Sequence, residues 1–88
     1  MNSFSKNLAE FLLAIKYIED ESLYYHFYEA RVRLGVDDFS LWIENTLGNK
    51  MLAKEIREID PYIHNMQGIR SKIIAAIERY LKSEMEII

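Results

Sequence analysis

The most constraining stretch of the sequence is residues 22–35, which read SLYYHFYEARVRLG. Ser22 is a typical N-cap residue, and Gly35 stands where a left-handed residue commonly ends a helix, so the stretch predicts one helix. Four apolar side chains recur at helical spacing and should face the core: Leu23, Phe27, Ala30 and Leu34. The opposite face carries Tyr25, Tyr28 and Val32, where a surface helix would carry charge. A helix that is apolar on both sides is normally covered on both, by the rest of the chain or by another molecule.

Helical spacing of apolar residues also marks the rest of the chain, and no alternation of apolar and polar residues is long enough for a strand. Capping residues and single glycines divide the sequence into five helices, beginning near Ser3 or Ser5, Ser22, Asp37 or Asp38, Asn49 and Asn65. Outside the second helix, the side chains predicted to face the core are Leu8, Phe11, Leu12, Ile15, Ile18, Phe39, Trp42, Ile43, Thr46, Leu47, Leu52, Ala53, Ile56, Ile59, Met66, Ile69, Ile73, Ala76, Ile77 and Tyr80. We therefore expect an all-α fold, a compact bundle of about five short helices with steep crossings.

Length and composition limit the kind of protein that this chain can be. Eighty-eight residues, half of them apolar, indicate a single helical domain that spans residues 1–88. The chain has no cysteine, which excludes disulfides and thiolate zinc sites and fits a cytoplasmic location. No stretch approaches the roughly 20 apolar residues of a membrane span, so we expect no membrane contact. The net charge of −3 argues against nucleic acid as a partner, because phosphate contact needs a basic excess.

A charged residue interrupts the apolar face of the last predicted helix. Arg70 falls inside this face, where an unpaired charge would be strongly destabilising. We therefore predict a carboxylate or a backbone carbonyl as its partner, with Asp38 and Asp60 as the first candidates. Arg31, at the border of the second helix, is expected to pair with another acid in the same way. We favour a structural role for both arginines, and the alternative is an anion-binding site.

Other candidates for chemistry have a simpler structural explanation. His26 and Glu29 share one side of a helix, but a di-iron bundle needs two such pairs in Glu-then-His order and two further carboxylates. His64 lies in a predicted loop without a visible catalytic partner. Placing Gly48 at the turn of a helix-turn-helix motif puts Glu44 at a position that requires a small residue. The sequence therefore predicts no metal, no cofactor and no enzymatic activity, with His26 at the edge of the core.

Four segments of the sequence carry a resemblance to a known family. They are residues 25–31 (YHFYEAR), 38–43 (DFSLWI), 60–62 (DPY) and 69–70 (IR). Together they resemble an uncharacterised family of small helical domains of archaea and bacteria, a domain of unknown function, over about residues 8–80. The resemblance implies an all-helical fold and supplies no activity, because none of the four segments has catalytic character.

The function that these features favour is a protein-interaction or assembly module of unknown pathway. Its predicted interface joins the outer face of the second helix to the apolar C-terminal tail: Tyr25, Tyr28, Val32, Met85, Ile87 and Ile88. Tyrosine-rich patches suit interfaces because the ring buries area while the hydroxyl stays wet. The predicted partner is a second copy of the chain, as a symmetric homodimer, or another protein. The alternative is a small-ligand or anion-binding sensor that uses Arg70, Arg31 and His26, and it loses its basis if both arginines are paired with acids.

Overall fold

The chain folds into helices joined by short connections over the residues that the structure describes. The computed structural model describes the backbone of residues 3–62 and 65–86 and the side chains of residues 7–62 and 65–83. Within these residues there are five continuous helical segments and no strand, which confirms the predicted all-α class. The segments are α1 (Ser3–Tyr17); α2 (Asp20–Tyr24), η1 (Tyr25–Glu29) and α3 (Ala30–Leu34), which together form the second helix; α4 (Asp38–Trp42) with η2 (Ile43–Leu47); α5 (Lys50–Arg57); and α6 (Met66–Glu86).

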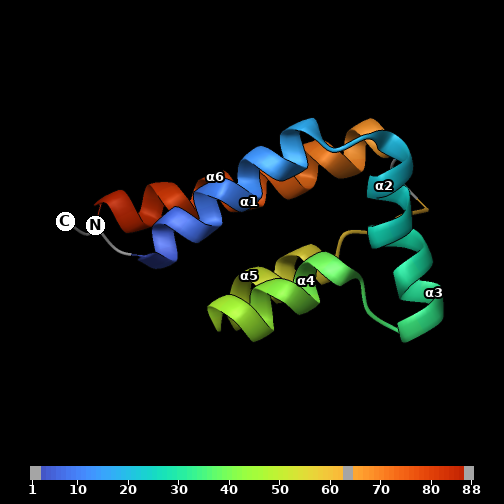
Figure 1. Cartoon of the computed structure of the whole chain (residues 1–88), viewed down its shortest axis with the longest axis horizontal. Helices are drawn as coiled ribbons and strands as arrows, with labels where there is room; N and C mark the ends of the chain where they lie inside the picture. The colour runs from blue at the N-terminus through green and yellow to red at the C-terminus, as the bar shows by residue number, and fades with distance from the viewer. Residues whose placement is uncertain (1–2, 63–64, 87–88) are drawn as a thin grey trace.

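The helices form two antiparallel pairs, and the second helix packs across one end of both pairs (Figure 1). α1 lies along α6, and α4–η2 lies along α5 (Figure 1). The axis of the second helix is steeply inclined to the helices of both pairs (Figure 1). The start of α1 and the end of α6 lie at the opposite end of a molecule that measures 38 × 22 × 19 Å. The steep crossings predicted for five short helices are therefore those between the second helix and the two helix pairs.

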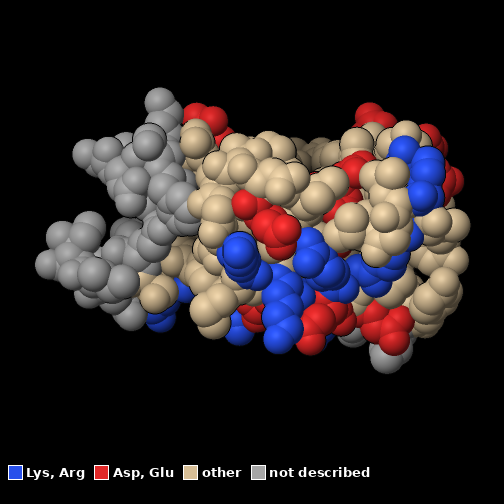
Figure 2. Space-filling view, turned by 90° about the horizontal axis from the view of Figure 1, so that it is seen from below, with Lys and Arg blue, Asp and Glu red and all other residues tan. Residues whose placement is uncertain are grey.

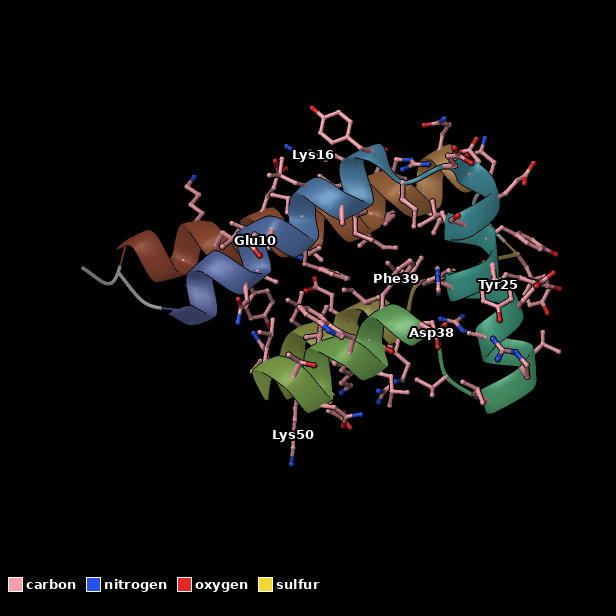
Figure 3. The ribbon with its side chains drawn as sticks, in the orientation of Figure 1. Glu10, Lys16, Tyr25, Asp38, Phe39 and Lys50 are labelled. Carbon is pink, nitrogen blue, oxygen red and sulfur yellow. The ribbon has the colours of Figure 1, made fainter. Side chains whose placement is uncertain are left out.

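The core lies between the two helix pairs and against the inner face of the second helix. Side chains from all five segments are fully buried: Leu8, Ile15, Leu23, Phe27, Ala30, Ile43, Leu52, Ala53, Ile56, Ile73 and Ile77. Phe39 projects from α4 into the space between the two helix pairs (Figure 3). Its ring meets that of Phe11 edge-on, with the ring centroids 5.9 Å apart. Most of the inward faces predicted from spacing are therefore confirmed.

Three residues predicted to face the core are exposed instead: Leu34, Trp42 and Thr46. Trp42 has an exposed fraction of 36% and stacks on the ring of Phe11 with centroids 4.7 Å apart. Leu34 is the last residue of α3, at the corner where the chain turns toward α4 (Figure 1), and its exposed fraction is 53%. Helical spacing cannot show where the covering elements end, so the last turn of a helix is easily misassigned. Thr46 lies in η2, where a wider turn changes the angular position of the residues along the helix.

Helix ends follow the predicted capping residues at most positions. Gly35 and Gly48 adopt left-handed φ angles of 81° and 68° and end the second and third helices. Three predicted N-cap side chains accept a hydrogen bond from the backbone N–H three residues later: Asp37 from Ser40, Asn49 from Leu52, and Asn65 from Gly68. Local sequence signals are sufficient to place these ends.

The start of the second helix differs from the prediction. Ser22, the predicted N-cap, lies inside the first turn, because the helix begins at Asp20 with Glu19 in an extended conformation before it. The N–H of Leu23 donates to the carbonyl of Glu19 at 2.9 Å. Asp20 and Glu21 therefore occupy the first turn, where negative charge interacts favourably with the helix dipole.

The surface carries charges of both signs. Lysine and arginine side chains are interspersed with aspartate and glutamate on the face seen from below (Figure 2). This mixture agrees with the small net charge of −3. None of the helices that the structure describes has the length and apolar character needed to cross a membrane.

Candidate functional site

Three tyrosines, two from the second helix and one from the connection after α5, pack together at the end of the molecule that lies away from the termini (Figure 1). Tyr24 and Tyr28, one turn apart, stack with ring centroids 5.0 Å apart and an interplanar angle of 16°. Tyr62, from the connection after α5, meets Tyr28 edge-on at 5.7 Å. The Tyr28 hydroxyl donates to the Tyr62 hydroxyl at 3.3 Å, and this hydrogen bond raises the pKa of Tyr28. We call Tyr24, Tyr28 and Tyr62 the tyrosine cluster.

Tyr25 has different neighbours from the tyrosine cluster. The guanidinium carbon of Arg33 lies 5.1 Å from the centre of its ring, and the ring of His26 meets it edge-on at 5.2 Å. Figure 3 shows Tyr25 on the second helix and Asp38 at the start of α4. Of the residues predicted for one outer face, Tyr25 and Val32 are exposed, whereas Tyr28 is half-buried. The prediction that Tyr25 and Tyr28 share one outer face is therefore wrong: Tyr25 is exposed beside Arg33, whereas Tyr28 packs within the tyrosine cluster.

A wide helical turn underlies this arrangement. η1 is a π-helical turn, in which the N–H of Ala30 donates to the carbonyl of Tyr25, five residues earlier. Within it Phe27 is fully buried, while Tyr25 on one side and Tyr28 on the other reach the surface. Single π-helical turns are rare and often coincide with functional sites. The widened turn therefore draws attention to the same segment as the exposed tyrosines do.

A shallow hollow of about 480 Å³ opens between the second helix and the start of α6. It is lined by Asp20, Glu21, Tyr24, Tyr25, Glu29 and Met66. Five of these six residues come from the second helix at intervals of four, as 20 and 24, and as 21, 25 and 29. We call it the tyrosine–carboxylate hollow.

Sequence reasoning missed most of this hollow, including Tyr24, Glu21 and Glu29. The interval of four that joins each tyrosine to a carboxylate was present in the sequence and could have indicated the hollow. The position of Met66 beside it depends on the packing of α6 and has no local signal.

Arg70 is paired, but with residues other than those predicted. Its Nη1 donates to the carbonyl of Ile15 at 2.7 Å, and its Nη2 donates to Oδ1 of Asp20 at 2.6 Å. The predicted partners Asp38 and Asp60 were wrong, because α6 packs against α1 and brings Arg70 to the junction between α1 and α2. Asp60 instead accepts a hydrogen bond from the backbone of Tyr62.

Arg31 is engaged in a similar way at the end of α5. Its guanidinium donates to the carbonyls of Arg57 and Ile59, at 2.8 and 3.1 Å, and lies 3.8 Å from Oδ2 of Asp37. Each of these two arginines thus satisfies carbonyls at the C-terminal end of one helix and meets an acid at the N-terminal end of another, where the helix dipoles favour both contacts. Their role in the described structure is to join helix ends.

His26 joins the second helix to α4. Its Nδ1 lies 2.9 Å from Oδ2 of Asp38, and its ring lies 5.7 Å from that of Phe39. The predicted position at the edge of the core is confirmed, since His26 is half-buried. Among the described residues, no three aspartate, glutamate or histidine side chains gather closely enough to hold a metal ion.

Several residues named from the sequence cannot be placed. Ile87, Ile88 and the side chain of Met85, predicted as part of the interface, lie outside the described residues, as does His64.

A larger hollow of about 660 Å³ lies between α5 and α6. Its lining mixes Glu55, Glu58 and Asp60 with Lys72 and Arg79. Arg79 forms a hydrogen-bonded ion pair with Glu55 across it. Because its charges are mixed and partly paired, this hollow shows no preference for one kind of ligand.

Comparison with known proteins identifies a family for the chain. Residues 2–78 match the family described as "Family of unknown function (DUF5752)", so the chain belongs to this family. The predicted resemblance to an uncharacterised domain family is thereby confirmed. No curated protein and no solved structure matches the chain.

Proposed function

We propose that this member of the DUF5752 family is a protein-interaction module whose second helix provides the contact surface. The observation that supports the proposal is the exposure of Tyr24 and Tyr25. Each ring already has a stacked neighbour within the chain, yet 41% of Tyr24 and 45% of Tyr25 remain exposed, and both line the same hollow. Tyrosine contributes a large, stiff contact area at an interface while its hydroxyl remains hydrated.

Further apolar side chains extend this surface. Val32 and Leu34 are exposed on the last turns of the second helix, and Tyr62 is the most exposed member of the tyrosine cluster. Several exposed apolar side chains on and beside one helix are typical of protein contact sites. The chain has no cysteine, so a contact formed in the reducing cytoplasm of an archaeal or bacterial cell would not depend on disulfides.

The partner is either a second copy of the chain or another protein. A symmetric dimer through the second helix would place the same tyrosines on both sides of a two-fold axis. Sedimentation of the purified chain over a range of concentrations separates the two cases. A concentration-dependent dimer that Tyr25→Asp dissociates would establish self-association, whereas a monomer at every concentration would leave a different protein as the partner.

A photo-crosslinking residue in place of Tyr25 tests the surface in lysate of the native host. Its matched control is the same residue in place of Tyr17, an exposed tyrosine on α1. A protein captured only at position 25 should bind the purified chain, and Tyr25→Asp should weaken that binding about tenfold or more, as expected for an interface tyrosine. Equal capture at both positions, or equal affinity of Tyr25→Asp and wild type, would refute the proposed surface.

The alternative of an anion-binding sensor has less support. It requires Arg70 and Arg31 to be available to a ligand, but both guanidinium groups are hydrogen-bonded to backbone carbonyls and lie close to acids. The absence of enzymatic activity stays a prediction.

A further inference from the structure

The chemistry of the tyrosine–carboxylate hollow indicates what kind of side chain it accepts. We propose that it binds an arginine or lysine side chain from a basic segment of the partner protein. This inference rests on the proposed function and specifies its partner. The supporting observations are the two exposed tyrosines, the carboxylates beside them and the apolar side chain of Met66 in the lining.

The two tyrosines offer open ring surface to the hollow. One side of Tyr24 is covered by Tyr28, and one side of Tyr25 is covered by Arg33, yet both residues remain exposed and both line the hollow. The ring of an aromatic residue attracts a cation placed over its face. The contact between Arg33 and Tyr25 shows that this tyrosine already accepts a guanidinium group on one side.

The carboxylates give the hollow a negative charge. Glu21 and Glu29 are exposed one turn before and one turn after Tyr25, and neither forms an ion pair with a described residue. Asp20 is paired with Arg70, and no lysine or arginine lines the hollow. An anionic group would be repelled here, and a purely apolar group would desolvate the carboxylates without compensation. A cationic side chain satisfies both the rings and the carboxylates.

The apolar part of the hollow's lining, Met66, favours a protein side chain over a free cation. The half-buried side chain of Met66 provides apolar contact for the methylene groups of an arginine or lysine. Val32 and Leu34 are exposed further along the same helix, beyond the reach of a small free amine bound in the hollow. A metal ion is a poor match, because no three described acidic or histidine side chains cluster there.

The test uses the full chain and a blocked peptide that contains two arginines. Two matched peptides carry lysine, or carry citrulline, which has nearly the shape of arginine without its charge. In an amide NMR titration, we expect the arginine and lysine peptides to shift the signals of residues 20–29 and of Met66. The citrulline peptide should bind about tenfold more weakly, and added salt should weaken the cationic peptides.

Charge variants of the chain complete the test. The double variant Glu21→Gln/Glu29→Gln should weaken binding of the arginine peptide by about fivefold, in keeping with exposed charge pairs. Glu58→Gln removes an exposed carboxylate from the hollow between α5 and α6 and should leave the affinity unchanged. All three residues are exposed, so the variants should keep the fold, which the amide spectrum itself reports.

Several results would overturn the inference. They are equal binding of the citrulline peptide, an equal loss in Glu58→Gln and in the double variant, and tighter binding of a free diamine than of the peptides. A dimer of the chain that the double variant dissociates would also overturn it, since the occupant would then be a second copy. If crosslinking at position 25 captures a validated partner whose affinity ignores the double variant, the proposed function stands and this inference fails. If Tyr25→Asp also leaves that affinity unchanged, both fail.

Discussion

The arrangement of Arg70 predicts how its stabilising effect is divided between its two partners. The side chain is 13% exposed, and its bond to the carbonyl of Ile15 lies at the end of α1. The side chain of Asp20 is 56% exposed. A hydrogen bond from a charged donor to a shielded carbonyl contributes about 1.5–3 kcal/mol, whereas an exposed ion pair contributes about 0.2–1 kcal/mol. Most of the effect should therefore come from the carbonyl.

The perturbation is Arg70→Met, which keeps an unbranched side chain of helical preference and removes both bonds. We expect the free energy of unfolding to fall by about 2–3 kcal/mol, because both hydrogen bonds are lost. The apolar contact of the methionine side chain offsets part of that loss. For a domain of this size, this loss lowers Tm by about 10–20 °C. Asp20→Asn removes only the charge of the exposed partner and should lower Tm by no more than about 5 °C.

Urea unfolding followed by circular dichroism measures these differences. Arg79→Met is the matched control, because Arg79 lies on the same helix, is also paired with an acid, here Glu55, and is 63% exposed. It should change the free energy of unfolding by about 0.5 kcal/mol or less. If Asp20→Asn destabilises the protein as much as Arg70→Met does, the ion pair rather than the carbonyl bond carries the effect, and the reasoning is refuted.

Three further predictions follow from single sites. Gly35→Ala should cost about 1–2 kcal/mol in urea unfolding, because φ is +81° and no atom lies within 4 Å of the added Cβ, so only backbone strain opposes it; an unchanged midpoint would contradict this. Tyr62→Phe removes the acceptor that raises the pKa of Tyr28, so an alkaline absorbance titration should show that pKa fall toward its ordinary value. Since the native pKa is raised, the contribution of Tyr28 to stability is complete below about pH 10 and decreases above it, and it should be smaller in Tyr62→Phe. Asp37→Ala should cost about 2–4 kcal/mol in thermal unfolding, because the buried carboxylate accepts hydrogen bonds from both the N–H and the hydroxyl of Ser40 at 2.7 Å; a loss below about 1 kcal/mol would show that water replaces it.

Features that depend on neighbouring residues were predictable from the sequence. The left-handed glycines at positions 35 and 48 and the cap at Asn49 require only a few residues of context. The requirement that Arg70 be paired also followed from its place on an apolar face. Its actual partner, Asp20, is 50 residues away, and finding it requires knowing that α6 packs against α1. Local patterns specify that a bond is needed without specifying the residue that forms it.

The separation of Tyr25 from Tyr28 was hidden for a different reason. A regular helix would place both on one outer face, as helical spacing predicts. The π-helical turn changes their angular relation, so Tyr28 packs between Tyr24 and Tyr62 while Tyr25 lies beside Arg33. Helical spacing does not distinguish a hydrogen bond from residue 30 to residue 25 from the regular one to residue 26.

The same contacts that hold the second helix also prepare it for binding. Its first turn is held by the bond between Asp20 and Arg70, and its last turns are held by Arg31 at the end of α5. The exposed Tyr24 and Tyr25 lie between these two attachments, on a helix whose inner face is fully buried at Phe27. A surface fixed in this way loses little conformational freedom when a partner binds, which favours affinity from a small contact area. Arg70→Met should therefore weaken partner binding as well as the fold, even though Arg70 does not line the hollow.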